Sequence, residues 1–463
     1  MNVTQKLANF VAGLSFKDLP AKAIKMAKLA TLDTIGVIFA GARETSSKIM
    51  VDFVSEFRGK EESTVIGQGF KASCPSAALA NGSLGHALDY DDTTTSGWIA
   101  GTRGGLHAGS PIVSAALAIS ERIGAEGRDF VTAITAAYDV GSRVAFTVNP
   151  QGQAGGWHPS GVFGTFAATA AAGKLLNFDE SQIVNALGIA GSQASGILQC
   201  YANGSPMKRV QSGLAARNGV LSALLTERGL LGPIEIFEGE LGFFNTYYKG
   251  IHNPEKITAE LGEKFAVAYN SFKLYPVCSI VHSSIDAALD LVQQHEIKPE
   301  DVENVKVWVS RSAYSYCCEP AERKYNPKTT VDIEFNIPFA VAAAISKRRV
   351  TLDEISESGL KDAEILALTK KVNATVDLNL FHPKCRMEIA LKDGRKVQRS
   401  IDEPRGFPNS NLHWSETDLV DKFRSCASTV TADHARIEKI IDLVQNLEKL
   451  DNITTVGDLV RLS

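Results

Sequence analysis

The sequence predicts a mainly helical protein with one smaller α+β domain. Apolar residues recur at helical spacing through the first 267 residues. A period of two, which is typical of strands, appears after about residue 268, and helical spacing returns after residue 405. We therefore expect a large all-helical domain, discontinuous in sequence, built from residues 1–267 and 406–463, with residues 268–405 forming a smaller α+β lid domain.

The first half shows helix patterns from residue 20 onward. Residues 20–42 begin with Pro20, a residue favoured in the first helical position, and the pattern ends near Gly41. Comparable spacing predicts helices over residues 110–124, 127–145, 161–176, 179–196 and 213–229. Residues 161–176 are small and apolar on nearly every side, so we expect this helix at the centre of a bundle.

The second half contains the strand patterns. Residues 303–310 alternate valines with other side chains, which predicts a strand. Residues 385–401 predict a hairpin, in which Asp393 and Gly394 form a two-residue turn. Residues 332–346 between these strands have a helical pattern. The helices expected after residue 405 should pack back onto the first domain.

Composition excludes several classes of protein. The 463 residues are 44% hydrophobic and 22% charged, with a formal net charge of -4 and no clustered basic face, so we expect no nucleic-acid partner. Apolar stretches are shorter than a membrane span, and no secretion signal is evident at the start. The seven cysteines form no CxxC pair and no cluster with zinc spacing. We expect a cytoplasmic protein with reduced thiols, no membrane partner and no metal.

Four polar stretches interrupt the apolar pattern. Residues 86–109, HALDYDDTTTSGWIAGTRGGLHAG, hold three aspartates within four residues and a histidine near each end. The other stretches are residues 155–166 with His158, residues 203–219 with Lys208 and Arg209, and residues 271–286 with Lys273 and His282. Helix N-termini attract anions, and histidine titrates near neutral pH. Cations and histidines converging at such positions would suit a small polycarboxylate substrate.

Each stretch also has a plainer explanation. A single histidine near a helix end is usually a cap or an interior residue, and we give that role to His86, His252, His295, His382, His413 and His434. The aspartates lack the spacing of a calcium loop. Lys208 and Arg209 could be solvated charges, and Lys273 could extend from a turn into solvent.

In this order, the four stretches resemble the MmgE/PrpD family, whose enzymes dehydrate, decarboxylate or epimerise small carboxylates. The likeness covers nearly the whole chain and includes LDTIGVIFAG, NGSLGHALDYDDT, GWHPSGVFGTFAATAAAGKLL, MKRVQSGLAARNG, KLYPVCSIVH and FRSCAS. The resemblance implies a large helical domain that is discontinuous in sequence, a small α+β lid, a homodimer, and catalysis without metal or organic cofactor.

The resemblance also implies the site residues. It assigns catalysis to Asp89, His107, His158, Lys208 and Lys273. It also matches Thr93 to the family's threonine, which we assign to substrate binding. From this sequence itself we add Arg103, Arg209 and Tyr275 to the substrate-binding residues, and Arg103 could meet an extra substrate carboxylate. Two departures from the family pattern are evident. The 94–106 loop is long and has Thr94 where many members have histidine, and Phe339 stands where several have tyrosine.

Carbanion chemistry beside a carboxylate would connect these residues. Lysines would stabilise the developing negative charge, the histidines would act as acid and base, and Asp89 would orient one histidine. We expect a cofactor-independent lyase that dehydrates or decarboxylates a small di- or tricarboxylate such as 2-methylcitrate or cis-aconitate. An epimerase or isomerase of a dicarboxylate such as iminodisuccinate would use the same residues. A non-catalytic helical dimer that binds a carboxylate would not need both histidines.

Overall fold

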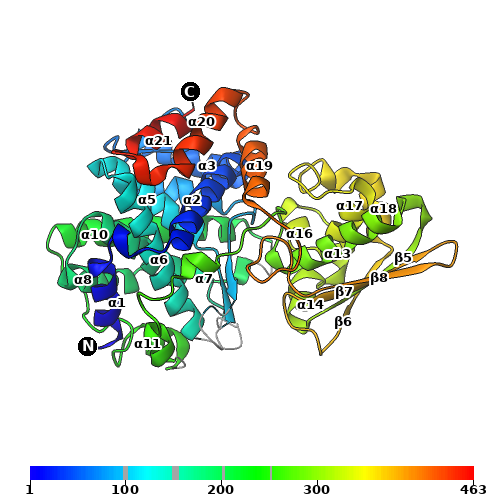
Figure 1. Cartoon of the computed structure of the whole chain (residues 1–463), viewed down its shortest axis with the longest axis horizontal. Helices are drawn as coiled ribbons and strands as arrows, with labels where there is room; N and C mark the ends of the chain where they lie inside the picture. Colours follow the sequence, from blue (N-terminus) through cyan, green and yellow to red (C-terminus); the bar gives the residue numbers. More distant parts are fainter. Residues whose placement is uncertain (97, 99–102, 149–155, 201–203, 251–252, 463) are drawn as a thin grey trace. The chain divides into compact units, whose positions relative to one another are not determined.

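The computed structural model describes residues 1–463 except 97, 99–102, 149–155, 201–203, 251–252 and 463. The chain divides into two compact units. The larger unit comprises Met1–Ala87, Asp91–Phe272 and Glu416–Ser463, and the smaller comprises Leu88–Tyr90 and Lys273–Ser415. The larger unit is helical and the smaller contains a four-stranded sheet (Figure 1), so the protein is mainly α with a smaller α+β part.

Helices make up most of the larger unit. They are α1 Val3–Gly13, α2 Ala21–Gly41, α3 Thr45–Glu56, α4 Cys74–Gly85, α5 Gly109–Ile123, α6 Gly127–Thr147, α7 Pro159–Leu175, α8 Glu180–Gly191, α10 Met207–Glu227, α11 Phe243–Tyr248, α12 Pro254–Thr258, α19 Glu416–Ala427, α20 His434–Gln445 and α21 Thr454–Val460. Two antiparallel pairs of short strands accompany them, β1 Ser63–Thr64 with β2 Lys71–Ala72, and β3 Thr94–Ser96 with β4 Arg103–Leu106.

Helix α7 is the central helix of this unit, as its composition predicted. It packs against α5, α6, α8 and α10, and nearly all of its residues are buried. Small residues make this packing possible. A Cβ added to Gly219 of α10 would lie 2.4 Å from the Cβ of Ala168 in α7, so the two backbones approach as closely as glycine allows.

Helices α2 and α19 bring the C-terminal segment of the larger unit against its N-terminal segment. Helix α2 ends at Gly41 as predicted, but it begins at Ala21, and Pro20 is its N-cap rather than its first residue. Helix α19 packs on α2, which confirms that the C-terminal segment returns to the first part of the chain. A buried ion pair of 2.6 Å between Lys422 and Asp33 joins the two helices.

The smaller unit combines one sheet with several helices. Its helices are α13 Ser279–His295, α14 Arg311–Cys317, α15 Ala321–Tyr325, α16 Thr330–Glu334, α17 Ile337–Lys347 and α18 Ala363–Thr369. Its strands are β5 Val302–Val309, β6 Val372–Val376, β7 Cys385–Leu391 and β8 Lys396–Ile401. The sheet order is β6-β5-β7-β8, and β5 runs parallel to β6 but antiparallel to β7. Helix α13 packs against α17, β7 and β8.

Two details of the smaller unit differ from the sequence predictions. The β7–β8 hairpin is present, but its turn has three residues between Leu391 and Arg395, and Gly394 adopts φ 89°. A three-residue turn of this kind needs one residue in the left-handed region, which glycine supplies. The predicted helix over 332–346 is split into α16 and α17, because the Asn336 side chain caps α17 by accepting from the Phe339 N–H.

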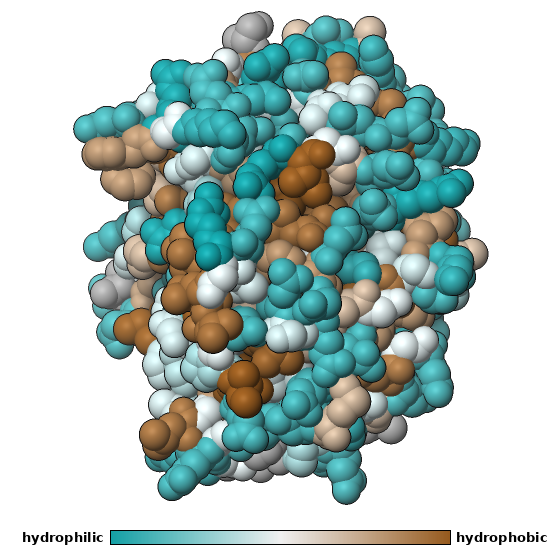
Figure 2. All heavy atoms as spheres, turned by 90° about the vertical axis from the view of Figure 1, so that its left-hand side faces the viewer, coloured by the Kyte–Doolittle hydropathy of each residue, from teal (hydrophilic) through white to brown (hydrophobic). Residues whose placement is uncertain are grey.

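Figure 2 shows one face of the protein, on which hydrophilic side chains predominate and hydrophobic ones gather in small patches. Exposed hydrophobic residues occur at several described positions, among them Ile49 and Phe53 within α3 and Phe57 directly after it. Within the described part of the chain, no helix has the length and hydropathy needed to cross a membrane.

Candidate active site

The C-terminal end of α4 brings a histidine and an aspartate together. His86 is the C-cap of α4 and is fully buried. The chain then turns through Asp89, which has φ 48°, a left-handed conformation that aspartate tolerates better than most residues. After this turn Asp91 faces His86, and its carboxylate oxygens lie 2.9 and 3.0 Å from Nδ1 of the ring.

Asp91 is an ionised carboxylate in the interior. Burial alone would raise its pKa, but the neighbouring His86 and His107 outweigh burial and hold the pKa well below the usual value. The Ser110 hydroxyl also donates to Oδ2 at 2.7 Å. Because the carboxylate can only accept hydrogen bonds, the Nδ1 atom of His86 carries the proton.

Lys208 completes this arrangement from a different helix. It is the second residue of α10, it is 7% exposed, and its Nζ lies 2.7 Å from Nε2 of His86. Burial lowers the pKa of His86 to about 4, although Asp91 opposes the shift. His86 is therefore neutral near pH 7, and its Nε2 lone pair accepts a hydrogen bond from the Lys208 ammonium.

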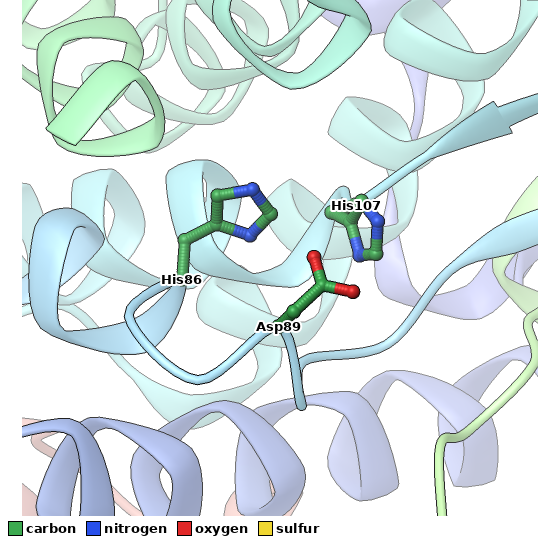
Figure 3. A group of neighbouring side chains, drawn as sticks. All are labelled: His86, Asp89 and His107. Carbon is green, nitrogen blue, oxygen red and sulfur yellow. The ribbon is translucent and has the colours of Figure 1, made fainter. Parts of the chain in front are cut away.

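Two further histidines surround His86. The ring centroids of His86 and His107 are 4.9 Å apart (Figure 3), and those of His86 and His158 are 5.5 Å apart. The Nδ1–H of His107 donates to the main-chain oxygen of Asp92 at 3.0 Å, so Nε2 is the nitrogen suited to exchange a proton. His158 is the N-cap of α7, and burial, assisted by Lys208, holds its pKa well below the usual value.

A second layer of polar residues supports the His107 loop. Asp92 is fully buried, accepts from the Gly109 N–H at 2.8 Å, and also accepts from Tyr138 and Asn270. Burial raises the pKa of Asp92 to about 7, and the charge of Asp33 adds to the shift. These contacts tie the loop to α6 and to the start of α5.

The smaller unit contains the other predicted catalytic residues. Lys273 is completely buried, and its Nζ donates to Oδ2 of Asp89 at 2.8 Å and to the main-chain oxygen of Asp89. Asp89 was expected to orient a histidine, and within the smaller unit its partner is Lys273. Helix α13 begins at Ser279, so Lys273 lies outside its first turn.

The predicted binding residues have varied surroundings. Thr93 is buried and pairs through its backbone with Ser271. Arg209 contacts Glu44 at 2.6 Å, and the Tyr275 hydroxyl donates to Asp286 at 2.6 Å. Arg103 is the first residue of β4, and its side chain is outside the described part of the chain, as is much of the 94–106 loop.

Phe339 and His282 are both buried in the smaller unit. Phe339 lies in α17 with no exposed surface. His282 lies in α13, and its Nε2 is 3.3 Å from the main-chain oxygen of Val277. Both surroundings are those of interior packing residues.

Sequence reasoning missed His86, Asp91 and Asp92. His86 was assigned a structural role because each histidine was judged alone. The useful signal was its distance from Asp91 along the chain. A helix that ends at His86 and a left-handed turn at Asp89 bring residues five apart into contact.

Figure 3 draws His86, Asp89 and His107, residue types that bind metal ions. The nitrogens of His86 are already engaged, since Nδ1 donates to Asp91 and Nε2 accepts from Lys208. This donor set therefore does not fit a metal unless Lys208 moves. The absence of a metal from the reaction stays a prediction.

Three imidazoles, one ammonium and one carboxylate thus meet in the interior of the helical unit. Imidazoles transfer protons near neutral pH, and a desolvated ammonium stabilises negative charge. This combination defines a site for proton transfer next to an anionic ligand.

Comparison with known proteins agrees with this class of site. A model of the MmgE/PrpD N-terminal domain matches residues 5–255, and a model of the C-terminal domain matches residues 275–447. The chain belongs to the MmgE/PrpD family.

Similar individual proteins carry one enzyme name. Cis-aconitate decarboxylase from Aspergillus terreus is 28% identical over 489 residues, which cover 99% of this chain and 96% of that protein. The Homo sapiens and Mus musculus cis-aconitate decarboxylases are 24% and 25% identical over 99% of this chain, with 95% and 93% of their own lengths covered. The family and these relatives together support a lyase.

Proposed function

We propose that this protein is a cofactor-independent lyase that decarboxylates cis-aconitate or a closely related small tricarboxylate. The observation that carries the proposal is the contact of the buried Lys208 ammonium with His86, beside His107 and His158. The relatives that match 99% of this chain are named cis-aconitate decarboxylase, which supports the choice of decarboxylation over the other reactions of the family.

The reaction needs a cation and a proton donor. When a carboxylate leaves as carbon dioxide, the C–C bond breaks and its electron pair stays on the remaining carbon. A neighbouring carboxylate takes up part of this charge, and Lys208 stabilises it electrostatically. A proton then binds to that carbon, so one proton replaces one carbon dioxide.

We assign the proton transfer to His107. Its Nδ1–H is held by the Asp92 main-chain oxygen, so a second proton on Nε2 is the one that it can deliver. The depressed pKa of His158 keeps that ring neutral, which suits an acceptor of hydrogen bonds from the substrate. Lys273 and Asp89 of the smaller unit supply a second ammonium and carboxylate.

Other residues complete the proposal. Thr93, Arg103 and Arg209 remain proposed substrate-binding residues, and Arg103 is assigned to an additional substrate carboxylate. For Tyr275, whose hydroxyl donates to Asp286, we propose a structural role instead. A single cleft that joins these residues at the junction of the two units also stays a prediction. The homodimer and the cytoplasmic location implied by the resemblance stay predictions as well, and light scattering would measure the oligomeric state.

One experiment separates the candidate reactions. Purified protein is incubated in deuterium oxide with unsaturated, hydroxy- and amino-polycarboxylates, and NMR follows each compound. Decarboxylation releases carbon dioxide and adds one deuterium, and dehydration releases water. Epimerisation exchanges one proton for deuterium and releases neither carbon dioxide nor water.

We expect decarboxylation of cis-aconitate that survives EDTA and disappears in Lys208→Met. His434→Gln changes an exposed histidine at the start of α20 and is the matched control that should remain active. Turnover of a hydroxy acid alone, or activity that needs added metal after EDTA, would contradict the proposal.

A further inference from the structure

Gln211 lies on the same face of α10 as Lys208, since the two residues are three apart in this helix. The Nζ of Lys208 contacts His86, and the ring of His86 stacks on that of His158 with the centroids 5.5 Å apart. Gln211 is 5% exposed and interacts with His158. Helix α10 therefore brings one polar side chain to each of the two stacked imidazoles.

The amide of Gln211 is oriented by residues 196 and 197, which lie between α8 and α10. Its Nε2 donates to the main-chain oxygen of Ile197 at 3.0 Å. A carbonyl oxygen can only accept, so the amide nitrogen faces Ile197 and the Oε1 atom, an acceptor, points away from it. Gly196 makes room for this amide, because a Cβ added there would lie 3.2 Å from Oε1, and its φ of 132° favours glycine.

The same segment holds His158. The His158 N–H donates to the main-chain oxygen of Gly196 at 3.0 Å, and Trp157 forms a β-bridge with Ile197. The Nδ1 of His158 and the Oε1 of Gln211 are both buried, and within the described part of the chain neither forms a hydrogen bond of regular geometry. The two side chains are nevertheless close enough that Gln211 opposes the lowering of the His158 pKa by burial. Each buried polar atom would cost free energy if it were left unpaired, which favours their pairing with each other.

We propose that Gln211 is a positioning residue for His158, whose Nδ1–H donates to the Oε1 of Gln211 and whose Nε2 keeps the lone pair. In His86 and His107 an oxygen acceptor also holds the proton on Nδ1. All three rings then have the same proton position and keep Nε2 for the chemistry of the site. This inference deepens the proposed function, on which its kinetic part rests.

Fixing the proton position has a chemical consequence. A neutral imidazole that is protonated on Nδ1 presents a lone pair at Nε2, so His158 can take up a proton or accept a hydrogen bond there. In the other tautomer, Nε2 would present a donor, and the lone pair of Nδ1 would face the lone pairs of the Gln211 oxygen. That repulsion disfavours the Nε2–H form, and Gln211 thus makes His158 an acceptor.

Ring proton positions test the inference without any substrate. ¹⁵N NMR of histidine-labelled protein distinguishes Nδ1–H rings from Nε2–H rings, and His158→Gln identifies the signals of His158 by their loss. In the parent we expect a proton on Nδ1 of His158 and none on Nε2. In Gln211→Met, which removes the acceptor, we expect the Nε2–H form of this ring to appear.

Two further variants separate positioning from a structural role. Gln211→Glu loses the donor to Ile197, as Gln211→Met does, but it keeps an oxygen acceptor, so Nδ1 of His158 should stay protonated. Gln193→Met is the matched control. The Gln193 side chain donates to Ser222 of α10 at 2.9 Å, and its loss should leave the His158 ring unchanged.

Kinetics provide the second test. We expect Gln211→Met to lower kcat/KM for cis-aconitate by about 10²-fold, as misplacement of a reacting group typically does. Gln193→Met should stay within a few-fold of the parent.

The parent and Gln211→Glu decide the case by NMR if Gln211→Met does not fold. A His158 ring protonated on Nε2 in the parent, or a folded Gln211→Met protein with an unchanged ring and unchanged kcat/KM, would overturn the inference. If no polycarboxylate turns over, the proposed function fails, while the ring proton positions still judge the inference.

Discussion

Arg143 and Lys208 are both buried cations of the larger unit, and the groups that they are seen to contact differ in kind. Arg143 has no exposed surface and donates to Asp139 at 2.9 Å and to the main-chain oxygens of Ile257, Ala259, Glu260 and Lys264. Lys208 contacts an imidazole, and two further imidazoles are close by.

The difference suggests that the Arg143 cluster stabilises the fold and that the Lys208 cluster serves the reaction. The Arg143 guanidinium is surrounded by acceptors, so its burial cost is met by the fold and little remains for a ligand. Around Lys208, burial and then the neighbouring cationic groups lower the pKa values of His86 and His158, and perturbed pKa values of this kind are common in active sites. Substitutions in the two clusters should therefore affect different quantities.

The largest effect is expected for His107→Gln. Loss of a general acid lowers kcat by about 10²–10⁴-fold. The glutamine can still donate to the Asp92 main-chain oxygen, so the free energy of unfolding should change little. Steady-state kinetics on the substrate found by NMR, together with thermal unfolding, measure both quantities. A kcat within a few-fold of the parent would make His107 a structural residue.

The opposite pattern is expected for Arg143→Met. Removing the cation leaves Asp139 with the Ala266 N–H but without its ion-pair partner, and it leaves several main-chain oxygens without their guanidinium donor. Breaking a buried pair costs about 3–5 kcal/mol. Urea unfolding should show this loss, while kcat per folded molecule stays within a few-fold. If Arg143→Met were as stable as the parent but inactive, the distinction between the two clusters would be wrong.

The sequence predicted the fold well because the signals were local. The small apolar residues of α7 and the alternating valines of β5 indicate, from the local sequence alone, which side chains are buried. The site was predicted only in part. Lys208 and His158 were identified through their motifs, whereas the partners of Arg209 and Tyr275 depend on residues distant in sequence, Glu44 and Asp286. His86 was missed because its contact with Asp91 depends on where α4 ends.

An effect of intermediate size is expected for the contribution of Asp92 to the pH dependence of the unfolding free energy. Its pKa in the folded protein is raised to about 7 from the ordinary value of 3.8, so the folded state binds a proton that the unfolded state has already lost. Stability from this group is therefore lost as the pH rises from about 4 to about 7, by up to roughly 1.4 kcal/mol per pH unit.

Asp92→Asn mimics the protonated acid and should lack this dependence. The difference in unfolding free energy between parent and variant cancels other titrating groups, such as Asp139. Urea unfolding at a series of pH values should show the parent losing stability relative to the variant up to about pH 7. A difference that is flat across this range would mean that Asp92 stays ionised.

The smallest effect is expected for Tyr275→Phe, which extends the comparison to the smaller unit. The Tyr275 hydroxyl donates to Asp286, and Asp286 also accepts from the Arg405 N–H at 2.9 Å. Since Asp286 keeps that second donor, the loss should be about 1 kcal/mol, the net value of a single hydrogen bond. This surrounding resembles that of Arg143 more than that of Lys208, so we expect KM to stay within twofold. Chemical unfolding and steady-state kinetics measure the two quantities. A KM that rises tenfold with unchanged stability would return Tyr275 to the substrate-binding residues that the sequence suggested.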